Sequence, residues 1–226
     1  MNVLFKYATR SRPELFKRGL ESIINNCTGK YHILVSIDED DESMNNEKML
    51  TYIYSSLHTS VKRGVSKNKI DAINRDVNDF TERMYDWDIL VNMSDDMVFT
   101  QKGFDDDIRG CMSFYGALIN LDQCLHFPDG NRSDLITMAI MGRAYYDRFG
   151  YIYHPDYKSL YCDNEMTDVA KTLNCYRYCD LQIFEHLHPA YSRHGAIFDA
   201  QYQHTESFMN EDRMTYLKRK SINFGL

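Results

Sequence analysis

The sequence predicts an α/β fold with a mostly parallel central sheet and helices on both faces, formed by a single domain over residues 1–226. Three observations support this prediction. Short apolar runs alternate with helical stripes over the first 100 residues, which is typical of parallel strands joined by helices. Short strands separated by turn residues follow in the second half. No linker, repeat or low-complexity segment interrupts the chain.

The first 100 residues are assigned from apolar periodicity. Pro13 suits the first position of a helix, because its missing N–H has no helical partner there. Ile70, Ile73 and Val77 recur at the spacing of one helix face. The predicted elements are strands at 2–7, 31–37, 60–61 and 89–91, with helices at 13–24, through 49–52 and at 67–84.

The second half is assigned mainly from turns and caps. Pro128, Asp129 and Gly130 provide turn chemistry between two strands. Asp163 suits the beginning of a helix, where acidic side chains complement the helix dipole. The predicted elements are strands at 118–121, 125–127, 135–141 and 175–184, with helices at 142–149, 163–173 and 206–220.

Composition excludes some classes of protein. The net charge is -7, which argues against general binding to nucleic acid or to anionic membranes. The six cysteines include no C-x-x-C pair, so we expect reduced thiols and a reducing compartment. No apolar run approaches the length of a membrane span, and no signal peptide is evident. We therefore expect a cytoplasmic protein.

Two adjacent carboxylates, Asp95 and Asp96, follow the apolar run at 89–91. Carboxylates at the end of a buried strand can hold a divalent cation against a phosphate, because hard cations prefer oxygen ligands. Ligand sites of open α/β sheets lie just beyond the carboxyl ends of the strands. The structural alternative is that the pair only caps a helix or forms a turn.

Four patterns occur in a fixed order along the chain. They are a strand ending in Thr9 and Arg10, a strand ending in Asp38, a Lys-x-x-Ala-x-Asn helix, and the strand ending in Asp95 and Asp96. This order resembles nucleotide-sugar glycosyltransferases of the GT-A fold, specifically the family-2-like group. The resemblance implies a nucleotide-binding half at residues 1–100. It also implies an acceptor and catalytic half at 101–226 with a C-terminal flap helix.

The resemblance implies a set of nucleotide-binding residues. Asp38 matches the position that reads the base, with Asp40 and Asp41 further along the same loop. Lys67 and Asn68 are alternatives to Lys69 for the basic contact. Solvated loop and surface side chains are the structural alternative for all of them. The full expected set is Tyr7, Thr9, Arg10, Arg12, Asp38, Lys69, Asn74 and Asp95.

The resemblance also implies a metal site for Mn²⁺ or Mg²⁺. Asp96 is the expected ligand, and Ser94 replaces the first carboxylate of the family's common Asp-x-Asp spacing. His188, or failing it His186, is expected to complete the cation shell. A hydrogen-bonded loop is the alternative explanation for both histidines.

Inverting transfer needs a carboxylate that takes the proton of the acceptor hydroxyl. Asp163 is the first candidate for this base and Glu165 the second, both at the beginning of a predicted helix. A helix cap and a first-turn acid would give the same pattern.

The resemblance therefore implies a metal-dependent glycosyltransferase with a nucleotide-sugar donor, expected to be a UDP-sugar. The acceptor hydroxyl belongs to an unknown glycan, lipid, protein or modified base. A nucleotidyltransferase is the alternative enzyme, although residues 7–13 lack the glycine-rich phosphate loop usual in that class. A non-catalytic nucleotide-sugar-binding module is the third interpretation.

Overall fold

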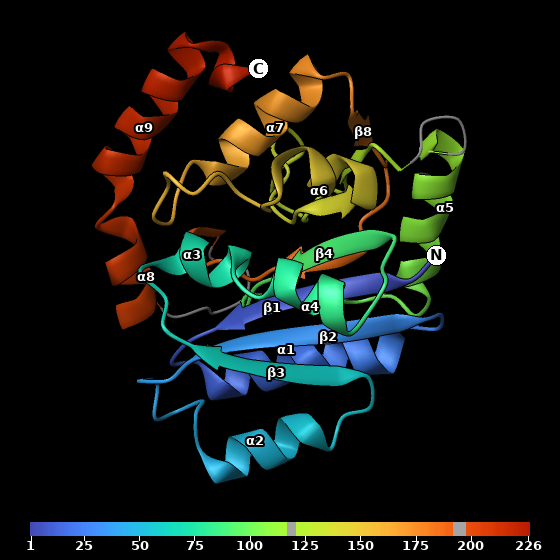
Figure 1. Ribbon diagram of the computed structural model, residues 1–226, viewed down its shortest axis with the longest axis vertical. Helices are drawn as coiled ribbons and strands as arrows, with labels where there is room; N and C mark the ends of the chain where they lie inside the picture. The colour runs from blue at the N-terminus through green and yellow to red at the C-terminus, as the bar shows by residue number, and fades with distance from the viewer. Residues whose placement is uncertain (117–120, 192–197) are drawn as a thin grey trace.

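The computed structural model describes residues 1–116, 121–191 and 198–226. A seven-stranded sheet in the order β3-β2-β1-β4-β7-β6-β8 forms its centre, with helices on both faces (Figure 1). The predicted fold class is confirmed. The strands are β1 Val3–Thr9, β2 Tyr31–Asp38, β3 Thr59–Gly64, β4 Ile89–Met93, β5 Met97–Phe99, β6 Cys124–His126, β7 Ile140–Gly142, β8 Tyr176–Tyr178 and β9 Phe184–His186. The helices are α1 Pro13–Asn26, α2 Glu47–Tyr54, α3 Lys69–Asn74, α4 Val77–Arg83, α5 Phe104–Gly116, α6 Arg143–Phe149, α7 Cys162–Thr172, α8 Ala200–Glu206 and α9 Met209–Ser221.

The first four strands of the sheet, β3, β2, β1 and β4, are all parallel. Successive side chains of a strand point to opposite faces, so the central strand β1 contributes to two cores. Phe5 packs in the core that includes α1 and α5, whereas Leu4 packs in the core that includes α3, α4 and α7. Burial on both faces explains why β1, β2 and β4 are mostly apolar, whereas the edge strand β3 is partly exposed and more polar.

The other three strands depart from the parallel pattern. β7 runs antiparallel to both β4 and β6, and β8 is parallel to β6. Gly142 ends β7 where a Cβ atom would lie 2.0 Å from the carbonyl oxygen of Leu121. The position therefore requires glycine, because the chain segments approach too closely for any side chain.

Several predicted boundaries are wrong. The helix expected at 67–84 is two helices, because Asp76 adopts a left-handed conformation with φ of 74° between α3 and α4. The strand expected at 135–141 is the short β7, and that expected at 175–184 gives β8 and part of β9. Residues 118–120 of another expected strand lie outside the described ranges. The sequence prediction missed β5, α5 and α8, and α9 begins at Met209.

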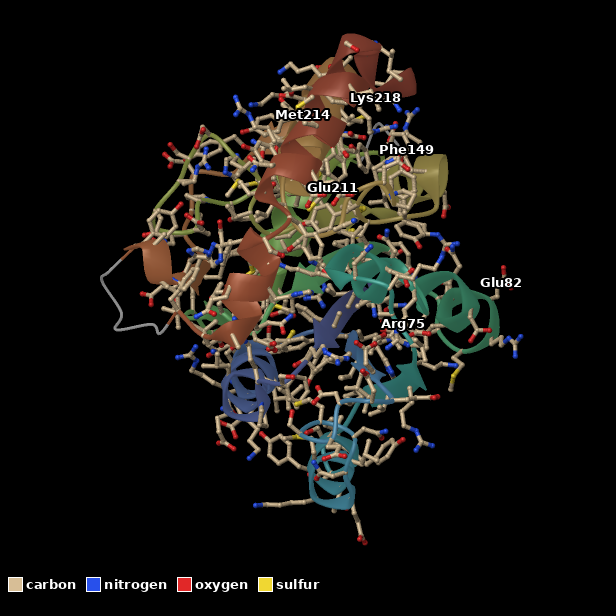
Figure 2. The ribbon with its side chains drawn as sticks, turned by 90° about the vertical axis from the view of Figure 1, so that its left-hand side faces the viewer. Arg75, Glu82, Phe149, Glu211, Met214 and Lys218 are labelled. Carbon is tan, nitrogen blue, oxygen red and sulfur yellow. The ribbon has the colours of Figure 1, made fainter. Side chains whose placement is uncertain are left out.

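The C-terminal helix α9 runs beside α7 at one side of the molecule (Figure 1). Glu211, Met214 and Lys218 lie along its outward side (Figure 2). Its inward side carries Asp212, which is completely buried. In the described part of the chain, every helix is too short or too polar to span a membrane.

Candidate active site

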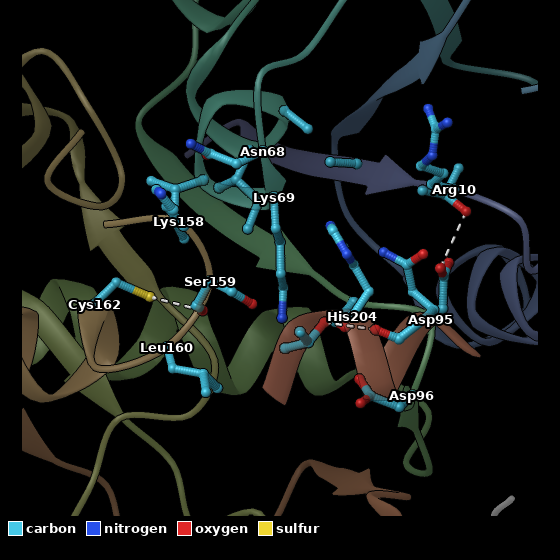
Figure 3. Close-up of a pocket in the computed structure, with 18 of the residues that line it drawn as sticks. Arg10, Asn68, Lys69, Asp95, Asp96, Lys158, Ser159, Leu160, Cys162 and His204 are labelled. Carbon is cyan, nitrogen blue, oxygen red and sulfur yellow. Dashed lines mark hydrogen bonds between the residues drawn. The ribbon is translucent and has the colours of Figure 1, made fainter. Parts of the chain in front are cut away.

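A cavity of about 430 Å³ lies at the carboxyl ends of the parallel strands (Figure 3). Thr9 ends β1, Asp38 ends β2, and Asp95 and Asp96 follow β4, so the sheet brings these side chains to one edge. The opposite wall comes from the segment 158–163, at the beginning of α7, and from α8. The cavity therefore joins the two halves of the chain.

Asp38 lies at the end of the cavity formed by β1, β2 and β3, and it is well paired. It accepts hydrogen bonds from Arg10 Nη1 at 2.9 Å and Ser66 Oγ at 2.6 Å, and Arg75 Nη2 lies 3.4 Å away. Arg10 also forms a bidentate pair with Asp40. These partners fix the direction of a carboxylate that is only 7% exposed.

Asp95 is buried and lines the cavity. Thr9 Oγ1 donates to its Oδ2 at 3.2 Å. Burial raises the pKa of Asp95 to about 7, because a charged carboxylate loses its hydration there. Its other oxygen, Oδ1, is buried without a hydrogen-bond partner among the described residues.

Asp96 has one oxygen paired and one unpaired. Tyr202 of α8 donates to Oδ2 at 2.7 Å, and His186 Nε2 lies 3.4 Å from the same atom. Burial by itself would raise the pKa of Asp96, but its interactions with His186 hold it well below the usual range. Oδ1 is buried without a partner in the described ranges.

His186 lies between two carboxylates. The β5–β9 pairing places it opposite Met97, and its Nδ1 lies 3.2 Å from Asp129 Oδ2. Burial opposes the charged form of His186, but Asp129 and Asp96 raise its pKa to about 9. Both ring nitrogens therefore face carboxylates.

His188 fits a metal better than His186 does. It lies in the same cavity, and its Nδ1 accepts a hydrogen bond from the N–H of Ala190 at 3.2 Å, which leaves the other ring nitrogen. Burial lowers the pKa of His188, which favours the neutral imidazole that binds metals. Within the described residues, no group of three His, Cys, Asp or Glu side chains is arranged to hold a metal by itself.

Lys69 begins α3 and extends into the space between the 159–162 segment and Asp95 and Asp96 (Figure 3). Asn68 caps this helix by accepting a hydrogen bond from the N–H of Asp71. Lys69 forms no ion pair with any described residue. Its charge acts on Asp95, Asp96 and Asp163.

Asp163 lies in the first turn of α7 and lines the cavity. The N–H of Asn164 donates to its Oδ1 at 2.9 Å. Burial raises the pKa of Asp163, so its carboxylate is a stronger proton acceptor than an exposed one. Sequence and structure therefore agree on its position at the cavity.

Three expected site residues lie away from the cavity. Tyr7 is completely buried, with its ring against Phe16 of α1. The Asn74 side chain bonds the backbone of residues 152–153. Glu165 pairs with Arg219 at 2.7 Å and accepts from Tyr157 Oη at 2.7 Å. Each of these side chains connects parts of the fold to one another.

Arg12 lines the cavity in contact with α8, the beginning of the expected C-terminal flap. It forms a bidentate pair with Asp199 and lies 4.1 Å from the centre of the Tyr202 ring. Sequence reasoning missed Tyr202, which donates to Asp96, and Asp129, which contacts His186. Asp129 had a local signal, since it lies in the predicted turn after β6, whereas Tyr202 had none.

Comparison with solved structures finds the same fold in proteins of low sequence identity. S. aureus TarS 1–349 superposes with a TM-score of 0.61 at 12% identity, over 82% of this chain and 60% of that chain. Its complex with UDP gives a TM-score of 0.62 at 12% identity over the same shares. The mannosyltransferase PcManGT from Pyrobaculum calidifontis, in complex with GDP-Man and Mn²⁺, gives 0.55 at 13% identity, over 80% of this chain and 54% of that one.

The chain thus spans about 60% or less of the length of these structures. No family model and no curated protein sequence matches it. At these identities the likeness shows the fold, which is GT-A-like as the sequence resemblance implies.

Proposed function

We propose that this chain is a glycosyltransferase that moves a sugar from a UDP-sugar to an acceptor hydroxyl, with inversion at the anomeric carbon. One observation carries the proposal. Asp38, Asp96 and Asp163 come from three separate elements, and all line one cavity at the edge of the sheet where ligands of α/β folds bind. Structures of the same fold hold UDP, or GDP-Man with Mn²⁺, which supports a nucleotide-sugar donor.

The nucleotide occupies the end of the cavity at β1, β2 and β3 in this proposal. Asp38 accepts a hydrogen bond from the base, since a carboxylate has more acceptor positions than its present partners use. Lys69 extends toward the centre of the cavity, where a cationic side chain stabilises the charge of a departing diphosphate. Arg10 lies beside Asp38 and supplies a further positive charge.

The acidic pair has the chemistry of a divalent cation site. The unpaired Oδ1 atoms of Asp95 and Asp96 are hard oxygen donors, which suit Mn²⁺ or Mg²⁺, and His188 is the available imidazole. A cation held there neutralises charge on the diphosphate. Ser94 provides a neutral hydroxyl where the family commonly has a carboxylate, so the protein contributes less negative charge to the cation.

Asp163 is the proposed base. Its carboxylate takes the proton of the acceptor hydroxyl as the acceptor oxygen bonds to the anomeric carbon, and the nucleoside diphosphate leaves from the opposite side. The raised pKa of Asp163 makes it a better proton acceptor for this step. Glu165 is less suitable, because Arg219 and Tyr157 already occupy both of its oxygens.

The first test measures thermal unfolding with UDP, GDP and ADP, each with and without Mn²⁺. We expect UDP with Mn²⁺ to raise the midpoint most, and Asp96→Asn to remove the effect of Mn²⁺. Glu82→Gln is the control, because Glu82 is an exposed carboxylate on α4, outside the cavity. A metal-dependent shift that survives in Asp96→Asn would contradict the proposed cation site.

The second test measures products from UDP-sugars. Release of UDP supports sugar transfer or donor hydrolysis. Release of pyrophosphate from a nucleoside triphosphate and a sugar phosphate would indicate a nucleotidyltransferase instead. Binding of UDP-sugars without turnover across a broad acceptor panel would favour the non-catalytic module.

A further inference from the structure

Arg75 follows α3 and connects several polar groups behind the end of the cavity at β2. Its Nε donates to Ser66 Oγ at 2.9 Å, and its Nη2 donates to the carbonyl of Ile37 at 2.7 Å. Its Nη1 lies 3.1 Å from Asp76 Oδ2, and Nη2 lies 3.4 Å from Asp38 Oδ1. Asp38 and Ser66 line the cavity, whereas Arg75 does not. The guanidinium therefore holds Asp38 from outside the cavity.

Two features of the chain place the guanidinium in this position. Asp76 adopts a left-handed conformation after α3, and Arg75 forms the C-cap of that helix with an extended backbone. Gly64 ends β3, and a Cβ atom there would lie 2.5 Å from Arg75 Nη1 and 3.3 Å from its Cζ. Glycine at the end of this strand therefore leaves the room that the guanidinium occupies.

The side of Arg75 away from Asp38 is held as well. Ser36 Oγ donates to Asp76 Oδ2 at 2.6 Å, and Lys6 Nζ donates to Ser36 Oγ. Lys6 is completely buried, and the Arg75 side chain is only 14% exposed. Hydrogen bonds to charged groups are stronger when they are shielded from water. Arg75 is therefore fixed between a buried polar network and the carboxylate of Asp38.

The two oxygens of Asp38 are held in different ways. Oδ1 accepts from Ser66 Oγ at 2.6 Å and faces Arg75, which also fixes Ser66. Oδ2 accepts from Arg10 Nη1 at 2.9 Å, but the Arg10 side chain is 39% exposed and also pairs with Asp40. Exposed ion pairs restrain side chains weakly. Arg75 and Ser66 therefore determine the direction of the Asp38 carboxylate more than Arg10 does.

The direction of this carboxylate decides which pyrimidine base it can bind. Uracil has an N3–H donor, whereas N3 of cytosine is an acceptor and the neighbouring amino group is the donor. A carboxylate fixed opposite N3 binds uracil and repels cytosine. One that is free to turn can accept from the cytosine amino group instead. A fixed acceptor therefore discriminates between the two bases more strongly than a mobile one.

We propose that Arg75 is a positioning residue for nucleobase selection, which fixes Asp38 together with Ser66 so that the site accepts uridine and rejects cytidine nucleotides. The inference deepens the proposed function and rests on it, because that proposal has Asp38 accept a hydrogen bond from the base. It adds a residue that does not line the nucleotide cavity. Loss of Arg75 should change the choice of base and not only the strength of binding.

The experiment measures the dissociation constants of UDP and CDP by calorimetry, both in the presence of Mn²⁺. Arg75→Met removes the guanidinium and keeps most of the length of the side chain. Gly64→Ala keeps the guanidinium but displaces it, because the added Cβ lies too close to Nη1. We expect Arg75→Met to lower the ratio of the CDP constant to the UDP constant about 5- to 20-fold, and Gly64→Ala about 2- to 5-fold.

Two further variants frame this result. Arg83→Met is the matched control, because Arg83 is a 73% exposed arginine of α4 that pairs with Asp79, and its ratio should equal that of the wild type. Asp38→Asn is the reference for loss of base selection, since an amide both donates and accepts. Circular dichroism and the midpoint of thermal unfolding show whether each variant is folded.

An unchanged ratio in folded Arg75→Met overturns the role of Arg75, even if both nucleotides bind more weakly, because that result indicates a general structural role. Where Arg75→Met does not fold, Gly64→Ala decides by the same criterion, since it keeps every side chain of the network.

Failure of the proposed function looks different. The wild type then binds no UDP, or prefers neither nucleotide, or has the same ratio as Asp38→Asn. Each of these results contradicts both proposals. A preference for UDP that is lost in Asp38→Asn but kept in Arg75→Met contradicts the role of Arg75 alone.

Discussion

The two ends of the cavity satisfy their polar groups in different ways. At the β2 end, the buried carboxylate of Asp38 has partners from Arg10, Ser66 and Arg75. At the α7 end, neutral oxygens such as Ser159 Oγ have none among the described residues. The polar groups of the first end are therefore paired even before a nucleotide binds, whereas those of the second end are not. Substitutions should lower stability at the first end and ligand binding or turnover at the second.

The largest expected effect is on turnover at the α7 end. Asp163→Asn removes the proton acceptor, and we expect the rate of sugar transfer to fall about 100- to 10,000-fold. The dissociation constant of UDP and the midpoint of unfolding should change little, because the contacts of the Asp163 carboxylate with described residues are to local backbone N–H groups. A transfer assay measures the rate, titration with UDP measures the dissociation constant, and thermal unfolding measures the midpoint. A variant that keeps most of its rate would contradict the role of Asp163 as base.

Arg75→Ala should have the next largest effect, and it acts on stability. The guanidinium donates to Ser66 Oγ and the carbonyl of Ile37, and it pairs with Asp76 and Asp38. Its removal leaves the buried Asp38 and the largely buried Asp76 less well paired, so we expect the free energy of unfolding to fall by about 2–4 kcal/mol. Denaturant titration measures this. A loss below about 1 kcal/mol would show that the pairing at this end contributes little.

Lys6→Met should stabilise the protein and change its response to pH. Lys6 is completely buried, and burial lowers its pKa to about 7. Between pH 7 and the usual lysine pKa of 10.5, the folded protein binds fewer protons than the unfolded one, so stability rises with pH. The variant should lose this rise and gain about 1–2 kcal/mol near neutral pH. Ser36 Oγ still donates to Asp76 in the variant.

Denaturant titrations of the wild type and Lys6→Met across this pH range measure both effects. If the wild type shows the same slope as Lys6→Met between neutral and alkaline pH, Lys6 is not a buried titrating group.

The smallest expected effect is that of Thr137→Val on the free protein. The hydroxyl removed has no described partner, so the free energy of unfolding should change by less than about 0.5 kcal/mol. This contrasts directly with Arg75→Ala. A fall in the free energy of unfolding by more than about 1 kcal/mol would show that the Thr137 hydroxyl already has a hydrogen-bond partner in the free protein. The two ends of the cavity would then not differ in how their polar groups are paired.

The carboxylates at the sheet edge were predictable from the sequence, because parallel strands joined by helices bring their carboxyl ends together. Asp38, Asp95 and Asp96 each follow an apolar run and line the same cavity. The pattern could not separate Asp163 from Glu165. Residues two apart on a helix differ by about 200° in direction, so when one faces the cavity the other faces away.

The partners from late in the chain were not predictable. Tyr202 reaches Asp96, and Asp212 reaches the loop at 158–160, through tertiary packing across many residues. The sequence of a charged helix such as α9 predicts only a solvated face. The buried Asp212 differs from the exposed Glu211 only in its tertiary contacts, and the local sequence does not reveal those contacts.

The position of Asp212 in the chain has a consequence for the order of folding during synthesis. The first four parallel strands are complete by residue 93, so this part of the sheet can assemble early on the ribosome. The loop at 158–160 and Glu165 complete their contacts with α9 only when Asp212 and Arg219 emerge. A nascent chain therefore completes the parallel strands on one side of the cavity well before the opposite wall, which is held in place only after Asp212 has emerged.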